Sequence, residues 1–221
     1  MATTVSLLSA DSYDLEALSQ ALTELLEPLG GMAAFVKKGD RVLLKPNLLT
    51  ASRPGNECIT RPELVYCVAQ MVQSVGGKPF MGDSPAFGTA HGVAEANGYL
   101  PLLKALEIPV VEFSGDRSFG CVPGKMKAWW HMEAGKDADR FGEMLVETAR
   151  AINPDLTILD GIIGHQGNGP INGEPSLLGV LAASADVFAL DWAIADILQV
   201  NPDHVPTLAA QRRLGLCASL E

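Results

Sequence analysis

Cysteine is scarce in this sequence, and its spacing does not suit a metal cluster. The four cysteines stand at positions 58, 67, 121 and 217, and none belongs to a C-x-x-C pair. Structural zinc sites and ferredoxin-type clusters use closely spaced thiolates. We therefore do not expect this chain alone to build a zinc or iron–sulfur centre.

Positive charge is scarce as well. Sixteen Lys and Arg residues stand against twenty-six Asp and Glu residues, which gives a formal net charge of −10. A chain this acidic repels nucleic-acid phosphates and anionic lipid surfaces. We therefore expect no nucleic-acid partner and no membrane partner.

Two kinds of hydrophobic run are missing. The N-terminus has no basic segment followed by an apolar one, as a signal peptide would. The most apolar stretch, residues 177–200, is interrupted by Asp186, Asp191 and Asp196, which a bilayer-spanning helix does not tolerate. These absences predict a cytoplasmic location.

Several catalytic signatures are also absent. The sequence contains no G-x-G-x-x-G after its first strand, no G-x-x-x-x-G-K-[ST], no G-x-S-x-G and no H-E-x-x-H. A dinucleotide-binding Rossmann domain, a P-loop nucleotidase, an α/β-hydrolase and a zincin protease are therefore not indicated.

Strand-like and helix-like segments alternate along the chain. Strands are predicted at 5–10, 40–49, 78–85, 108–114, 154–164 and just before 184, and helices begin near 14, 60, 91, 141, 184–186 and 208. Thr60 and Glu63 flank Pro62 in the pattern of a capping box. The alternation predicts an α/β fold with a mainly parallel sheet and helices on both faces. We expect a single domain over residues 1–221, or two lobes divided near 115–136.

Polar residues follow two of the predicted strands. Lys45 and Asn47 end the second strand, and Asp83 and Ser84 end the third. Ligands of parallel sheets bind beyond the carboxyl ends of the strands, so these side chains are candidates for a shared site. A lysine there suits anion binding or catalysis, and its alternative role is a side chain that merely reaches solvent. Asp83 is a candidate metal or hydroxyl ligand, or else the start of a turn before Pro85.

The segment "ILDGIIGHQGNGPINGEP" (158–175) is rich in glycine and polar residues. Asp160 could bind a metal or a hydroxyl group, and His165 could act as an acid or base. Gly167, Asn168 and Gly169 could bring backbone N–H groups close to an anion or a carbonyl. The alternative is a long turn that satisfies its own polar groups. We expect one wall of a ligand site here.

Two further segments carry candidate residues. Asp191 lies beside Trp192 in an apolar context, whereas Asp186 fits the N-cap of a helix. Lys125 and Lys127 lie close to Trp129 and Trp130, where aromatic rings and cations could hold an anion or a ring. The alternative for this segment is an amphipathic surface anchored by its two tryptophans.

Five segments in the same order resemble the domain of unknown function 362 family over roughly residues 40–215. They are VLLKPNLL, TRPELVYCVAQMVQSVGGKPFMGDSP, FGCVPGK, PDLTILDGIIGHQGNGP and GVLAASADVFALDWAIADIL. The resemblance implies an α/β domain accompanied by ferredoxin-type iron–sulfur modules, with a 4Fe–4S cluster only in a module outside this chain. It points to Lys45, Pro46, Asn47, Asp83, Gly124, Lys125, residues 160–170 and Asp191 as site residues.

The chain departs from the family pattern at three places. Gln166 stands where the family's loop usually has Glu, and a longer segment is expected between Ser114 and Ser118. The sequence also stops at LGLCASLE, where family chains continue. The resemblance therefore implies an internally shortened or truncated form, with any cluster cysteines beyond it.

Two functions fit these observations, and the residues do not decide whether the protein is an enzyme. In the first, a redox-coupled domain binds a small anionic or metal-bound ligand at the carboxyl ends of its strands. Lys45 and His165 are then the catalytic candidates, and Asp83, Asp160 and Asp191 are the metal candidates. In the second, a non-catalytic scaffold docks a ferredoxin-like partner through the glycine-rich loop, Trp129 and Trp130.

Overall fold

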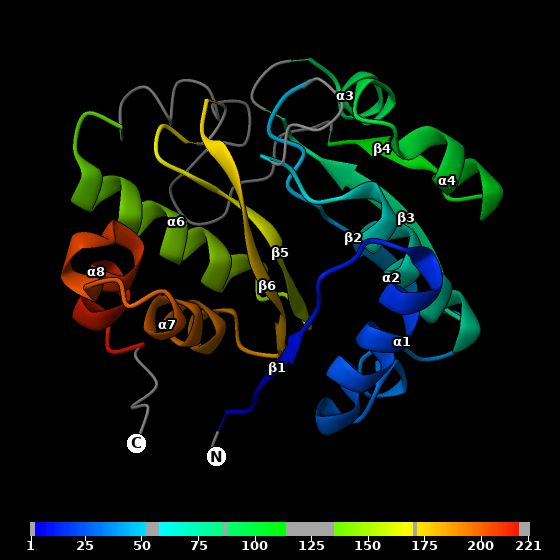
Figure 1. Cartoon of the computed structure of the whole chain (residues 1–221), viewed down its shortest axis with the longest axis horizontal. Helices are drawn as coiled ribbons and strands as arrows, with labels where there is room; N and C mark the ends of the chain where they lie inside the picture. Colours follow the sequence, from blue (N-terminus) through cyan, green and yellow to red (C-terminus); the bar gives the residue numbers. More distant parts are fainter. Residues whose placement is uncertain (1–2, 52–57, 86–87, 114–134, 170–171, 217–221) are drawn as a thin grey trace. The chain divides into compact units, whose positions relative to one another are not determined.

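The computed structural model describes residues 3–51, 58–85, 88–113, 135–169 and 172–216 (Figure 1). Lys125, Lys127, Trp129 and Trp130 lie outside these ranges. The chain divides into two compact units: an amino unit of Ser6–Phe113 and Leu159–Ala182, and a carboxyl unit of Met1–Val5, Ser114–Ile158 and Ala183–Glu221. The choice between one domain and two lobes stays a prediction.

The predicted α/β class is confirmed, since helices and strands alternate along the chain. The elements are β1 (Val5–Ser9), α1 (Leu15–Leu26), η1 (Glu27–Leu29), η2 (Met32–Ala34), β2 (Arg41–Leu44), α2 (Pro62–Ser74), β3 (Lys78–Asp83), α3 (Ala90–Ala96), α4 (Tyr99–Ala105), β4 (Val110–Glu112), α6 (Ala138–Ile152), β5 (Thr157–Gln166), β6 (Glu174–Ser184), α7 (Val187–Ile197), η4 (Pro202–His204) and α8 (Pro206–Arg213). Among the described residues, no helix is long and apolar enough to cross a bilayer.

One sheet is parallel and lies in the amino unit, in the order β2-β3-β4 (Figure 1). Leu44 pairs with Met81, and Asp83 pairs with Glu112, so the carboxyl ends of the three strands share an edge. Lys45 follows β2 directly, and Asp83 is the last residue of β3. The parallel sheet thus provides the expected edge for these two polar strand exits.

The second sheet is antiparallel, in the order β1-β6-β5, so the prediction of a mainly parallel sheet holds for one sheet only. β5 ends at Gln166 and β6 begins at Glu174. This connection is too short for a parallel crossover, which needs a dozen or more residues, and the two strands instead form a hairpin. A Cβ on Gly161 would lie 2.8 Å from the carbonyl oxygen of Val180, so glycine lets β5 approach β6.

Helix α2 begins at Pro62, but the predicted capping box is wrong. The N-cap is Arg61, whose side chain makes no capping hydrogen bond. The Thr60 hydroxyl instead accepts a hydrogen bond from the backbone N–H of Asn47, at 3.1 Å. A tertiary contact therefore takes the side chain that the local pattern assigned to the helix end.

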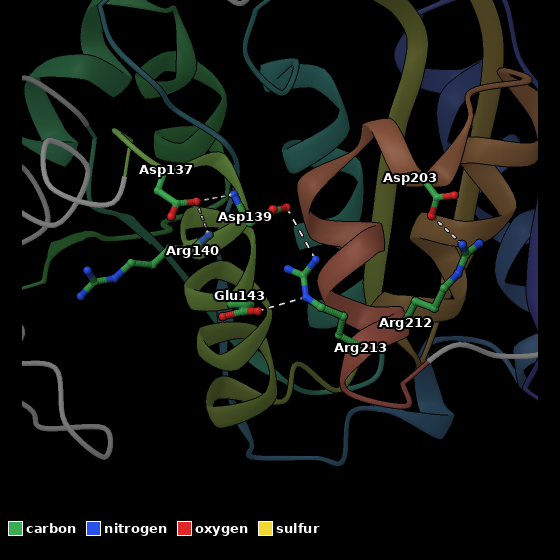
Figure 2. A network of polar contacts seen from close by, with 7 residues as sticks. All are labelled: Asp137, Asp139, Arg140, Glu143, Asp203, Arg212 and Arg213. Atoms are coloured by element: carbon green, nitrogen blue, oxygen red, sulfur yellow. Dashed lines mark hydrogen bonds and ion pairs between the residues drawn. The ribbon is translucent and has the colours of Figure 1, made fainter.

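Helices α6, α7 and α8 build the carboxyl unit. The predicted N-cap of α7 is confirmed, because the Asp186 carboxylate accepts from the N–H groups of Phe188 and Ala189. Helices α6 and α8 are joined by ion pairs, in which Arg213 lies 3.1 Å from Glu143 and 3.6 Å from Asp139 (Figure 2). These groups are exposed, so each pair contributes little to stability.

Candidate functional site

The candidate site of the amino unit is centred on an ion pair between Lys45 and Asp83. The Lys45 Nζ lies 2.7 Å from the Asp83 Oδ1. The Asp83 side chain is 4% exposed, whereas that of Lys45 is 49% exposed. The buried carboxylate therefore fixes one end of the pair, and the ammonium group of the half-exposed Lys45 side chain has donors beyond the one that this pair uses, since an ammonium has three.

The turn that presents Lys45, residues 45–50, is held by hydrogen bonds on both sides. The second carboxylate oxygen of Asp83 accepts from the N–H of Leu48, at 3.1 Å. The side-chain amide of Asn97 donates to the Thr50 carbonyl, at 3.0 Å. Leu49 has a φ of 48°, an unusual conformation for a branched residue. Such strain persists only where the surroundings hold it, and it often accompanies function.

Asn47 and Thr60 connect this turn to the start of α2. Besides receiving the N–H of Asn47, Thr60 donates its own N–H to the Asn47 carbonyl, at 3.1 Å. Tyr99 lies beneath them, fully buried, and its hydroxyl donates to the Thr60 carbonyl. Asn47 itself is exposed, and in the described part of the chain its side-chain amide bonds to no protein group. Its amide is therefore available to a ligand.

Asp160 lies within β5, in the part of the chain where a strand was predicted at 154–164. Its Oδ1 accepts from the Tyr13 hydroxyl at 2.6 Å, and its Oδ2 accepts from the backbone N–H of Arg61 at 2.8 Å. Both carboxylate oxygens thus already bind protein donors. Asp160 acts here as a tie between β5, the approach to α1 and the start of α2.

Arg61 is a cation of this region that the sequence reasoning missed. Its guanidinium carbon lies 4.6 Å from the centroid of the Tyr13 ring, and its Nε lies 3.3 Å from the Glu63 carboxylate. The signal was present in the segment TRPE, where a capping-box reading drew attention to Thr60 and Glu63 instead. An arginine at a helix N-cap offers no acceptor for the helix N–H groups, so its side chain makes tertiary contacts instead.

The pKa of the Tyr99 hydroxyl is shifted by burial and by nearby charged side chains. Burial raises the pKa of Tyr99 above its usual value, and the negative charges of Asp160, Asp83 and Glu63 raise it further, whereas Arg61 lowers it. The hydrogen bonds between Asn47 and Thr60 link the turn that carries Lys45 to Arg61 and its tie to Asp160, so these groups belong to one polar cluster.

The remaining candidates of the amino unit are not drawn into this cluster by any contact described above. Asp160 and His165 are five residues apart in β5, so the alternation of a strand puts them on opposite faces. Gly167 and Gly169 lie past the end of β5, with open space where a Cβ would be, and Asn168 is exposed. Ser84 directly follows β3.

Asp191 belongs to the carboxyl unit, so the structure does not join it to Asp83 and Asp160. Its carboxylate accepts from the side-chain amide of Gln211, at 2.9 Å. Desolvation raises the pKa of Asp191, and the hydrogen bond from Gln211 partly offsets this.

The described residues do not fit a metal ion or an iron–sulfur cluster. They contain no group of three or more His, Cys, Asp or Glu side chains that could hold a metal. Of the cysteines they include, Cys67 is buried and donates to the Leu15 carbonyl. Burial raises the pKa of the Cys67 thiol to about 11, which opposes the thiolate form that a cluster requires.

The chain belongs to the family described as domain of unknown function (DUF362), whose model matches residues 42–118 and 117–196. A relative from Synechocystis sp., named thylakoid-associated protein sll1697, is 60% identical over 259 residues, covering 98% of this chain and 81% of the relative. No solved structure matches the chain. The resemblance noted from the sequence is thus confirmed.

Two expectations meet these comparisons. The cytoplasmic prediction is wrong, because a relative that covers nearly the whole chain at 60% identity is a thylakoid-associated protein. The absence of a signal peptide pattern was not a sufficient guide to location.

The alignment of 259 positions is longer than the 221-residue chain, so the relative has residues within the matched span that this chain lacks. The two family matches meet at residues 117–118, where the sequence predicted a shortening.

Proposed function

We propose that the carboxyl edge of the parallel sheet binds a small anionic ligand through Lys45 and Asn47. The observation that carries this proposal is the half-exposed side chain of Lys45, whose ammonium is paired at 2.7 Å with the carboxylate of a side chain that is 4% exposed. An anion site needs a cation that the protein holds in place on one side and that a ligand can reach from the other side. Whether the ligand is then transformed is a separate question.

Rigidity of the presenting turn supports this role. Asp83, Thr60 and Asn97 each bind backbone groups of residues 45–50. The chain therefore orders this turn during folding rather than during binding, which removes an entropic cost from ligand association. In this proposal Lys45 and Asn47 touch the ligand, Asp83 and Asp160 position the turn, and His165 has no assigned step.

Metal and redox chemistry enter the proposal only through other molecules. The described residues contain no group of three or more His, Cys, Asp or Glu side chains that could hold a metal, and in this proposal a metal comes with the ligand. A 4Fe–4S cluster would come with a ferredoxin-like module or partner. The relative's name further suggests that binding takes place in association with thylakoids, which co-fractionation of the tagged chain with thylakoid membranes would test.

The test of the anion site is an NMR titration of the full chain with acetate and with inorganic phosphate. We expect Lys45-dependent shifts of the Asn47 side-chain amide, and a loss of affinity of about tenfold in Lys45→Gln, which removes the charge but keeps a donor for Asp83. Lys78→Gln is the matched control, since Lys78 begins β3 at the opposite edge of the same sheet. Wild-type affinity in Lys45→Gln would exclude the site.

A second function, docking of a ferredoxin-like partner, has one specific observation in its favour. Leu177 of β6 is 67% exposed, close along the chain to the glycine-rich turn. A large apolar side chain this exposed suits a protein interface. Leu177→Ser should then weaken binding of a reduced ferredoxin while leaving the anion titration unchanged. Equal ferredoxin binding by the wild type and by Leu177→Ser would exclude this docking function.

A further inference from the structure

We propose that the outer face of the parallel sheet is a docking surface for an amphipathic helix that another polypeptide supplies. The outer face is defined by the side chains of Leu43, Phe80, Val111 and Phe113. It includes none of the residues of the proposed anion site, so either proposal can fail while the other stands.

The inner face of the same sheet is covered by helices. Leu44, Met81 and Val110 share a hydrophobic core with residues of α2, α3 and α4. The register pairs Leu44 with Met81 and Met81 with Val110, so these side chains leave the sheet on one side. The three helices therefore lie on that side.

The residues that alternate with these point to the opposite side, and they are apolar. Leu43 pairs in register with Phe80, and Gly82 with Val111. The ring of Phe113, which follows β4, lies over β3, since a Cβ on Gly82 would be 2.7 Å from it. Leu43 and Phe113 are 42% and 48% exposed, and Phe80 and Val111 are partly buried. The outer face is thus a continuous apolar surface that a partner can reach.

An accessible apolar face is unusual for a parallel sheet. All-parallel sheets occur almost only with both faces covered, because crossover connections place helices on them. A face that meets water is typical of antiparallel sheets, where it carries polar residues. The outer face has the composition of a covered face, so its side chains suit packing against a helix.

The longer relative has room for such a helix. Its alignment spans 259 positions against the 221 residues of this chain, a difference of 38, so at least that many of its residues have no counterpart here. The two family matches meet at residues 117–118, shortly after Phe113 and the end of β4. A crossover from β4 would begin at this point. Helix α2, on the inner face, has 13 residues, so the difference is long enough for a comparable helix.

The edge at which β2 and β3 begin is basic, which adds a charge requirement. Arg41 and Lys78 pair in register, and Lys37 and Lys38 shortly precede Arg41. All four cations are exposed. Asp40 is the carboxylate in this stretch, and it accepts from the backbone N–H of Lys37 at 2.8 Å. This edge therefore attracts negative charge, although the chain as a whole has a net charge of −10.

The basic edge fixes the direction of the docked helix. Crossover helices run back from the carboxyl ends of the strands to the amino ends, so the helix C-terminus would lie beside Arg41 and Lys78. A helix C-terminus carries roughly half a negative charge, and acidic side chains in its last turn add to it. The Arg41 guanidinium lies over the Phe80 ring, 5.0 Å from its centroid, at the border between the basic edge and the apolar face. The expected partner therefore has an apolar stripe and an acidic last turn.

The first test uses a synthetic peptide with those residues of the Synechocystis relative that this chain lacks. It is titrated into the full chain by calorimetry, and its helix content is followed by circular dichroism. We expect it to become helical on binding, and Leu43→Ser to weaken the affinity about tenfold, as loss of a buried leucine does. Leu7→Ser is the matched control, since Leu7 is 47% exposed but lies in β1 of the antiparallel sheet.

Charge reversal at the basic edge tests the direction of the helix. Arg41→Glu and Lys78→Glu should each weaken peptide binding several-fold, and the effect should grow at low ionic strength, where screening is weak. Lys104→Glu is the matched control, since Lys104 lies in the last turn of α4, on the inner side of the sheet.

The outcomes decide between occupants of the outer face. No peptide binding, or equal binding by Leu43→Ser and Leu7→Ser, overturns the docking surface. Binding that depends on Leu43 but not on Arg41 or Lys78 overturns the acidic last turn. A dimer of the full chain that Leu43→Ser dissociates in sedimentation would assign the face to a second copy instead. Leu43-dependent binding to vesicles of phosphatidylglycerol and phosphatidylcholine, without peptide binding, would assign it to a lipid surface. Phe113→Ser replaces Leu43→Ser if the latter lowers the unfolding midpoint.

Discussion

The turn at residues 45–50 and the glycine-rich turn at 167–173 look similarly polar in the sequence but differ in the structure. The first is held by Asp83, Thr60 and Asn97, and it contains Leu49 in a left-handed conformation. In the second, an added Cβ on Gly167 or Gly169 would meet open space.

The contrast shows that glycine content is a weak guide to a binding site. A ligand site needs side chains held in place before the ligand arrives, and that requires donors and acceptors from elsewhere in the fold. Lys45 meets this condition through Asp83, which is thirty-eight residues away in sequence. Asn168 has no such tie in the described structure, although its neighbours first suggested one.

The largest expected effect comes from removing the Asp83 carboxylate, which binds the turn at residues 45–50. Asp83→Ala leaves Lys45 without its partner and the Leu48 N–H without its acceptor in a buried setting. We expect a loss of about 2–3 kcal/mol in the free energy of unfolding, reduced from the full cost of a buried pair because Lys45 can turn to solvent. Urea denaturation measures it. Asn168→Ala, at the second turn, should change the same quantity by less than about 0.5 kcal/mol.

Two glycines of β5 sharpen the comparison inside the hairpin itself. Gly161→Ala places a Cβ 2.8 Å from the carbonyl oxygen of Val180, so the strands must separate. We expect a loss of about 2 kcal/mol, as overpacked sites show. Gly164→Ala meets nothing within 4 Å and should lie within about 0.5 kcal/mol of the wild type. Similar unfolding midpoints for the two variants in urea would contradict the close approach at Gly161.

A pair of asparagine variants separates binding from stability. Asn47→Ala removes the amide that we propose as a ligand contact, and about fivefold weaker acetate binding is expected, equivalent to about one hydrogen bond. Asn168→Ala should bind acetate as the wild type does. Both side chains are exposed, so the melting temperatures should agree within about 2 °C. Weaker binding in Asn168→Ala alone would move the site to the glycine-rich turn.

Local patterns predicted the parts of this structure that depend on neighbouring residues. The α7 N-cap at Asp186, the start of α2 near Pro62 and the exit of β2 at Lys45 all follow from short sequence signals. The antiparallel hairpin was missed because alternating strands and helices suggested crossovers throughout. The short, glycine-rich connection from Gln166 to Glu174 was the available signal for it.

The site could be predicted only in part, since it depends on contacts between distant segments. Lys45, Asn47 and Asp83 were predicted to lie near one another because the ends of parallel strands meet at one edge. Arg61 and Tyr13 were missed, because their roles depend on a contact with Asp160 that lies about a hundred residues or more away. Sequence spacing alone carries no trace of such a contact.

The smallest expected effect concerns Asp191, whose carboxylate accepts from a neutral amide, whereas that of Asp83 is paired with the ammonium of Lys45. Desolvation raises the pKa of Asp191, and Gln211 offsets this only in part. The folded state therefore binds this proton more tightly than the unfolded state, so the contribution of Asp191 to stability is present at acidic pH and is lost as pH rises through its raised pKa. Asp191→Asn, which still accepts from Gln211, should stabilise the chain by about 0.5 kcal/mol near pH 7, a value kept small by solvent exposure. Urea denaturation at several pH values should show this gain in the free energy of unfolding shrinking towards about pH 4. If Asp191→Asn is instead less stable than the wild type near pH 7, the ionised carboxylate contributes more to stability than its desolvation costs.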